Sequence, residues 1–69
     1  MSDDFNMSMR KFLKTVGVTS QQQIEEAVRT ARDNGTLPAG AVTATVTVTV
    51  EGLSLNHTVA GEITMPDND

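Results

Sequence analysis

The sequence has no cysteine, tryptophan or tyrosine, and its only aromatic side chains are Phe5 and Phe12. Without cysteine there is no disulfide, and one histidine cannot supply the ligands of a zinc site. At 69 residues, the chain lies near the lower size at which a single core sustains a fold. We therefore predict one small domain over residues 1–69 that depends on association with another chain for part of its stability.

Charge is unevenly distributed, because residues 34–50 carry none and no lysine or arginine follows residue 33. The net charge of −4 disfavours nucleic acid or an anionic membrane as the main partner. No apolar run approaches the roughly 18 residues of a membrane span, and the acidic start differs from a secretory signal. We expect a cytoplasmic protein that contacts no membrane, with disordered ends at residues 1–4 and 66–69.

The first half of the sequence has the period of amphipathic helices. Apolar residues from Phe5 to Val16 share one face, and Gly17 suits the left-handed position that ends a helix. Thr19 with Gln22, or Ser20 with Gln23, then matches the capping box that begins a second helix. An Asn-Gly pair at residues 34 and 35 ends it. These signals predict two helices joined as an αα-hairpin.

The second half alternates with period two, which indicates strands. Residues 41–50 read AVTATVTVTV, and the alternation resumes from residue 53 to residue 65. A two-residue turn at residues 51 and 52 would pair Val48 with Leu55, and a four-residue turn would pair it with Leu53. Both turns keep the apolar residues on one face, whereas a three-residue turn would divide them between two faces.

The predicted fold is therefore α+β: a two-helix hairpin followed by an antiparallel β-hairpin (ααββ), with the helices packed on one face of the sheet. The first strand has none of the charged or proline residues that usually protect an exposed edge. An isolated two-stranded sheet is also marginally stable. We expect one edge of this hairpin to pair with the same edge of a second copy and so complete a four-stranded sheet in a homodimer, and the sequence leaves open which of the two strands is central. The candidate dimer strand is the first one, with Thr43, Thr45, Thr47 and Thr49.

A small basic strip on the first predicted helix is the candidate interaction patch. It consists of Met7, Arg10, Lys11 and Lys14. The first functional hypothesis is a protein-interaction or regulatory adaptor that uses this patch to bind an acidic or mixed protein surface. The alternative is a nucleic-acid-associated accessory protein, in which these bases and Arg29 and Arg32 contact phosphates.

Nothing in the sequence indicates catalysis. The five glycines lack the spacing of phosphate-binding loops. His57 has no nucleophile motif and no second soft ligand beside it, so a buried or interfacial packing role is the ordinary interpretation. We therefore expect no enzyme activity, no catalytic or metal-binding residues and no cofactor.

Three segments of the first half carry a recognisable pattern: F-N-M at residues 5–7, R-K-F-L-K at 10–14 and V-G-V-T-S-Q at 16–21. Further matches are I-E-x-A-V at 24–28 and V-E-G-L at 50–53. With these segments the chain resembles a family of short bacterial proteins known only as a domain of unknown function. The resemblance implies a bacterial, cytoplasmic setting and assigns no activity, cofactor or catalytic residue. The threonine-rich strand departs most from the pattern, and His57 is outside it.

Overall fold

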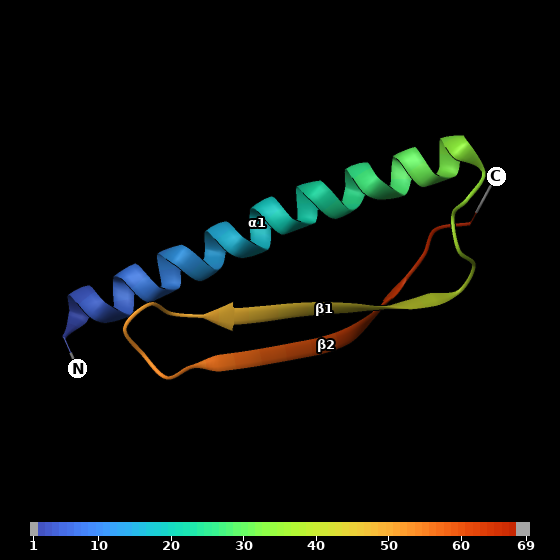
Figure 1. Ribbon diagram of the computed structural model, residues 1–69. Coiled ribbons are helices and arrows are strands. Elements are labelled where there is room, and N and C mark those ends of the chain that lie inside the picture. The colour runs from blue at the N-terminus through green and yellow to red at the C-terminus, as the bar shows by residue number, and fades with distance from the viewer. Residues whose placement is uncertain (1, 68–69) are drawn as a thin grey trace. The chain divides into compact units, whose positions relative to one another are not determined.

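The computed structural model describes residues 2–67, which form one helix and two strands (Figure 1). The helix α1 spans Asp3–Asn34, and the strands β1 and β2 span Ala41–Thr49 and Asn56–Thr64. The chain divides into two compact units, Met1–Thr36 and Leu37–Asp69, and each is described by itself. The α+β class is confirmed. Met1 and residues 68 and 69, within the ends predicted to be disordered, lie outside the described residues.

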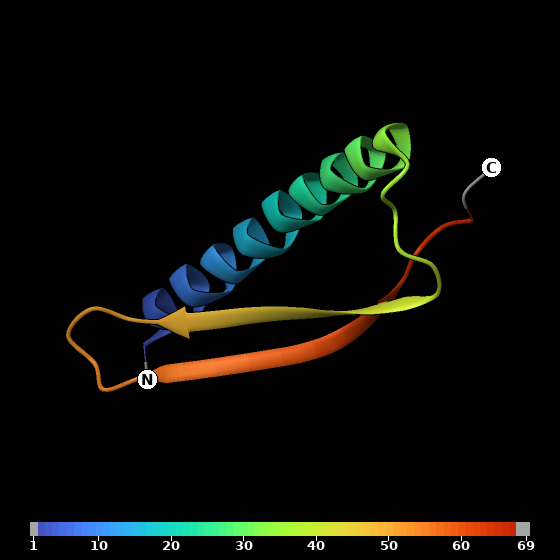
Figure 2. The same cartoon turned by 45° about the vertical axis from the view of Figure 1, so that its right-hand side comes forward.

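The prediction of two helices is wrong, because α1 is a single helix of 32 residues. It runs without interruption in both ribbon views (Figures 1 and 2). Gly17 does not have the positive φ of a helix cap, since only Gly35, Gly40 and Gly52 have positive φ among the described residues. At 1.5 Å per residue, the helix is about 48 Å long.

Backbone hydrogen bonding explains why the helix continues past Gly17. A glycine inside a helix costs about 1 kcal/mol relative to alanine, whereas a break would leave four N–H and four C=O groups without helical partners. The predicted capping hydroxyl is also used differently, because the Thr19 hydroxyl donates to the Thr15 carbonyl at 2.7 Å. Thr15 donates likewise to the Lys11 carbonyl at 3.1 Å. These threonines bond back along the helix and begin no new one.

The true ends of α1 have clear caps. Ser2 is the N-cap, and its side chain accepts a hydrogen bond of 3.2 Å from the Phe5 amide. Asp3 and Asp4 lie in the first turn, where the helix dipole favours acids. The helix thus begins inside the segment 1–4 that we predicted to be disordered. Gly35, with φ of 73°, provides the left-handed C-cap, as the sequence predicts.

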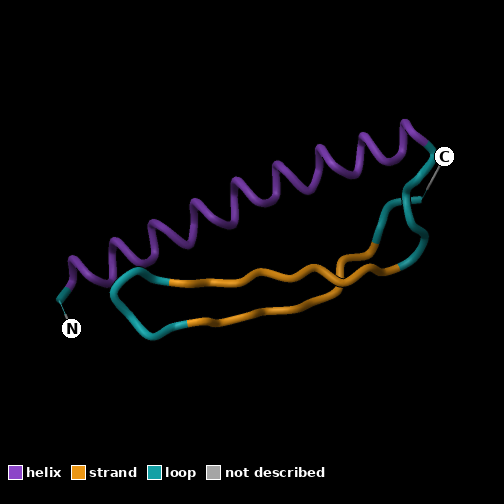
Figure 3. Tube along the Cα trace, viewed as in Figure 1, coloured by secondary structure: helices purple, strands orange, loops and turns teal. Residues whose placement is uncertain are grey.

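The two strands pair antiparallel in a two-stranded sheet, with Val48 opposite His57 and Val46 opposite Val59. Both predicted registers are wrong, because each placed Val48 opposite a residue closer to the turn. The loop in Figure 3 is correspondingly longer than two residues, since no strand residue lies between Thr49 and Asn56. Each predicted register differs from the observed one by an even number of residues. The apolar residues of the two strands therefore share one face, as predicted.

Turn chemistry explains the longer loop. The Leu53 amide donates to the Val50 carbonyl at 3.2 Å, so the predicted turn at residues 51 and 52 does form. Gly52 has φ of 84° and no non-glycine residue has positive φ, which excludes the type I′ turn that two-residue hairpins favour. A turn of the other hand does not match the twist of the strands. The ladder therefore starts only beyond residue 55.

No residue in the described part of the chain is buried. Several large apolar side chains of α1 are well exposed, including Phe12 at 59% and Leu13 at 50%. Val59 of β2 is 51% exposed. Neither unit therefore has a hydrophobic core of its own, and the predicted packing of helix on sheet stays a prediction.

The continuous helix predicts the effect of replacing Gly17 by alanine. An added Cβ at Gly17 meets nothing within 4 Å, and alanine has the higher helix propensity. Gly17→Ala should therefore raise the free energy of unfolding by about 0.5–1 kcal/mol, measured by thermal denaturation followed by circular dichroism.

The matched control is Gly35→Ala, because the two glycines belong to the same helix. At Gly35 the positive φ disfavours any side chain, so this change should lower stability by about 1 kcal/mol. Destabilisation by both changes would mean that Gly17 ends a first helix, as in the two-helix interpretation.

Candidate functional site

The four residues of the candidate interaction patch share one face of α1. Met7, Arg10, Lys11 and Lys14 are related by steps of three and four residues, which place side chains above one another on a helix. All four side chains are exposed, and Met7 is 68% exposed. The patch therefore presents three positive charges beside an apolar thioether, a composition that suits an acidic surface with some apolar area.

The single helix also fixes the two remaining bases relative to this patch. Arg29 follows Lys11 by 18 residues, and Arg32 follows Lys14 by the same number. Eighteen residues make five helical turns at 3.6 residues per turn, so the bases in each pair lie on the same line along the helix. All five bases therefore lie on one side of α1. Glu25 lies on that side between the two groups and reduces the positive potential.

The candidate dimer strand presents a polar face made largely of threonines. Thr43, Thr45, Thr47 and Thr49 alternate along β1 and are all exposed. Their cross-strand partners are Glu62, Ala60, Thr58 and Asn56. The hydroxyl oxygens of Thr47 and Thr58 are 3.3 Å apart and share a hydrogen bond. With only one partner strand, β1 has a second edge whose backbone groups the hairpin itself leaves unpaired.

His57 lies at the first pair of the apolar face, opposite Val48, and its side chain is exposed. The prediction that His57 lies on the apolar face is confirmed. The side chain is not buried by other residues of the chain. Among residues 2–67, no three of the histidine and acidic side chains come close enough together to hold a metal ion. A metal site that included His57 would therefore need ligands from outside these residues.

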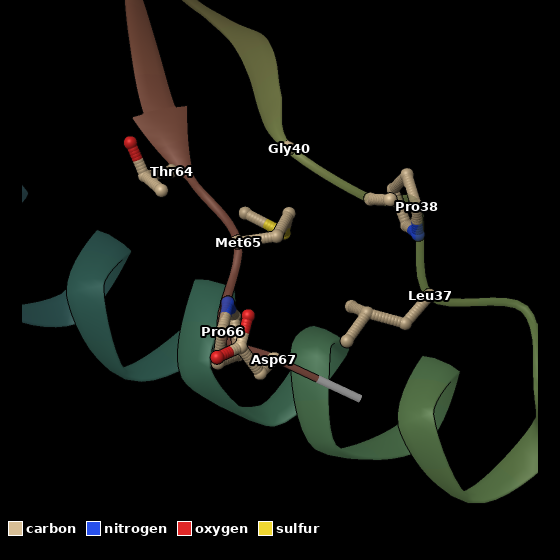
Figure 4. Close-up of a pocket in the computed structure, with 8 residues that line it drawn as sticks. Leu37, Pro38, Gly40, Thr64, Met65, Pro66 and Asp67 are labelled. Atoms are coloured by element: carbon tan, nitrogen blue, oxygen red, sulfur yellow. The ribbon is translucent and has the colours of Figure 1, made fainter. Parts of the chain in front are cut away.

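A shallow hollow of about 230 Å³ lies where the strands leave the sheet (Figure 4). The Met65 amide donates to the Gly40 carbonyl at 2.8 Å, which extends the ladder by one pair. The Met65 side chain reaches toward the segment that carries Pro38. Asp67 is the only charged side chain of the lining, so the hollow lacks the convergent polar groups of a small-molecule site. Its two prolines were the only sign of this hollow in the sequence.

The helical residues that the structure describes include no stretch that is both long and apolar enough to cross a membrane.

The position of His57 predicts a small effect on stability. His57→Val would place two β-branched apolar side chains opposite each other and should raise the free energy of unfolding by about 0.2–1 kcal/mol. Chemical denaturation measures this change. Thr58→Val is the control on the polar face of the hairpin. This substitution removes the hydroxyl group that shares a hydrogen bond with Thr47. A loss above about 1 kcal/mol for His57→Val would show that the ring makes a hydrogen bond in the native assembly.

Comparison with known proteins gives one match. The model of a family described as a family of unknown function, DUF6494, matches residues 1–66. This match confirms the resemblance that the sequence pattern indicates. No curated protein and no solved structure matches the chain.

Proposed function

The chain belongs to the DUF6494 family of unknown function, and we propose that it is a homodimeric protein-interaction module, an adaptor with no enzyme activity. A second copy completes its fold, and the patch of Met7, Arg10, Lys11 and Lys14 binds an acidic protein surface. This role needs no cofactor.

The observation that carries this proposal is the lack of buried side chains among residues 2–67. Ordering a residue costs about 1–2 kcal/mol of conformational entropy, and apolar burial is the main term that offsets this cost. A lone helix and a two-stranded hairpin provide little of it by themselves. A chain of 69 residues without disulfides gains the missing burial by association.

The edge of β1 supports pairing between copies. The strand has nine residues with no charge and no proline, and its side chains alternate regularly. Edges with these properties are templates for another strand. Antiparallel pairing of β1 with its counterpart would extend the sheet to four strands and place the threonines of both copies on one face.

Substitution of Thr45 tests the dimer. Thr45→Lys places a charge on the proposed pairing strand, and two copies would bring the lysines near each other. We expect the unchanged protein to sediment as a dimer at micromolar concentration, and Thr45→Lys to shift it toward monomer by at least about tenfold in Kd.

Ala60→Lys is the matched control, because Ala60 lies directly opposite Thr45 on β2 and shares its face. It should leave the dimer unchanged. A monomeric mass for the unchanged protein at all concentrations would contradict the proposal, and equal effects of both changes would show that β1 is not the pairing strand.

One observation favours the alternative function, binding of nucleic acid. The single helix aligns Arg29 and Arg32 with the patch, so all five bases lie on one side of α1. Contact with even three phosphates would make log Kd depend on log salt with a slope magnitude of about 2–3. The net charge of −4 and the position of Glu25 oppose such binding.

We therefore predict no binding to duplex DNA or single-stranded RNA at physiological salt, measured by fluorescence anisotropy. The adaptor patch should instead bind acidic peptides, and the double change Arg10→Glu and Lys14→Glu should abolish that binding while the protein stays folded and dimeric. Micromolar binding of nucleic acid that this double change removes would establish the alternative in place of the adaptor.

A further inference from the structure

The C-terminal end of α1 places an asparagine side chain next to a residue that has no side chain. Asn34 is the last helical residue, it is exposed, and Gly35 follows it. Apart from the neighbours of Gly35 in the chain, nothing lies within 4 Å of the point where its Cβ would be. The Asn34 side-chain amide can therefore approach the Gly35 backbone nitrogen without steric hindrance, and spontaneous deamidation of asparagine requires this approach.

The Gly35 amide takes part in the hydrogen bonds that end the helix. It donates to the Arg32 carbonyl at 3.1 Å, and the Thr36 amide donates to the Ala31 carbonyl at 2.8 Å. These two bonds form a Schellman motif, with Gly35 in the left-handed position. While the motif is closed, the Gly35 nitrogen keeps its proton in the bond to Arg32, and the backbone of Asn34 stays helical. Attack on the Asn34 side chain therefore requires the motif to open.

We propose that Asn34 is a site of spontaneous deamidation and that opening of the Schellman motif sets the rate. After losing its proton, the Gly35 nitrogen attacks Cγ of Asn34, and the side-chain nitrogen leaves as ammonia. The product is a cyclic imide, the succinimide. Water then breaks one of the two imide C–N bonds, which gives aspartate or isoaspartate. The net reaction converts an amide and water into a carboxylic acid and ammonia, with no oxidation or reduction.

Both products destabilise the helix end at which they form. Each places a carboxylate next to Asp33 at the C-terminal end of α1, where the helix dipole favours bases. Isoaspartate also inserts the side-chain methylene of Asn34 into the backbone, which moves the Gly35 amide away from the Arg32 carbonyl. The Schellman motif then does not re-form, so the change is irreversible. The modified chain therefore loses helical residues at this end of α1.

The position of Asn34 determines which part of the protein the modification changes. Asn34 lies close to the end of the first unit, Met1–Thr36, and the second unit, Leu37–Asp69, follows directly. Deamidation therefore alters the segment that joins the helix to the hairpin, and it leaves the interaction patch and β1 unchanged. The modification is independent of the adaptor role and of the homodimer proposed above.

Two other asparagines among the described residues provide internal controls. Asn6 precedes Met7 inside α1, and Asn56 precedes His57, which pairs with Val48 in the sheet. In both places the following residue has a side chain, and its amide belongs to regular secondary structure. Asn6 and Asn56 should therefore deamidate more slowly than an asparagine followed by glycine at a helix end.

Mass spectrometry of the aged full-length protein tests the proposal. The protein is incubated at mildly alkaline pH, fragmentation assigns each deamidated residue, and an isoaspartate-specific methyltransferase detects isoaspartate. We expect Asn34 to convert at least about tenfold faster than Asn6 or Asn56. Asn34→Gln should remove the main product and the methylation signal, because the longer glutamine side chain forms the cyclic imide much more slowly.

A substitution of Thr36 tests the control of the rate by the Schellman motif. The Thr36 hydroxyl donates to the Ala31 carbonyl at 3.3 Å and so adds a third hydrogen bond to the helix end. Thr36→Ala removes this bond and should speed the deamidation of Asn34 by about twofold to tenfold, because one net hydrogen bond is lost from the closed motif. Thr36→Ser keeps the hydroxyl, so this matched control should leave the rate unchanged.

The same incubation in urea gives the rate for the opened chain, which we expect to be at least about tenfold higher than the rate for the folded protein. Equal rates in the two conditions, or no effect of Thr36→Ala, would show that the Schellman motif does not control the reaction. Conversion of Asn6 or Asn56 as fast as Asn34, or no conversion of Asn34 in the folded protein, would show that Asn34 is not the site. Each of these results overturns the proposal.

Discussion

Both units of this protein are limited by the same constraint: each has an apolar face that it cannot remove from water by itself. A helix can cover one stripe of its surface only with another element, and a two-stranded hairpin has the same need. Phe12 at 59% and Val59 at 51% exposed illustrate this in the two units. The proposed assembly follows from this constraint, because burial has to come from contacts beyond each unit.

The comparison of sequence and structure shows which local signals compete. Asp3, Asp4 and the Asn-Gly pair at residue 34 correctly indicated the ends of α1. Gly17 and Thr19 carried equally good capping chemistry but form none, because the unbroken backbone ladder retains more hydrogen bonds than a cap would provide. Capping residues therefore permit a helix end without requiring one. The sequence alone does not show whether the helix ends at such residues or continues through them.

The hairpin shows a different limit. Alternation of residue types determined which side chains share a face, and this was predictable because a strand has period two. The register was not, since it depends on the backbone hand of the turn at Gly52, which the residue types left open. The interaction patch was predictable for the same periodic reason, because Met7 and Lys14 share a face in any helix. The alignment of Arg29 with Lys11 required the continuity of α1.

That continuity also sets a geometric condition on whatever binds the bases. The two basic groups are separated by five turns of one helix, which is about 27 Å. A short acidic peptide would reach only one group, whereas a folded partner whose carboxylates have matching spacing would engage both. Engagement of both groups would raise the affinity through effective concentration, and would do so only for partners of the right dimensions. The length of α1 thus favours recognition by spacing over recognition by charge alone.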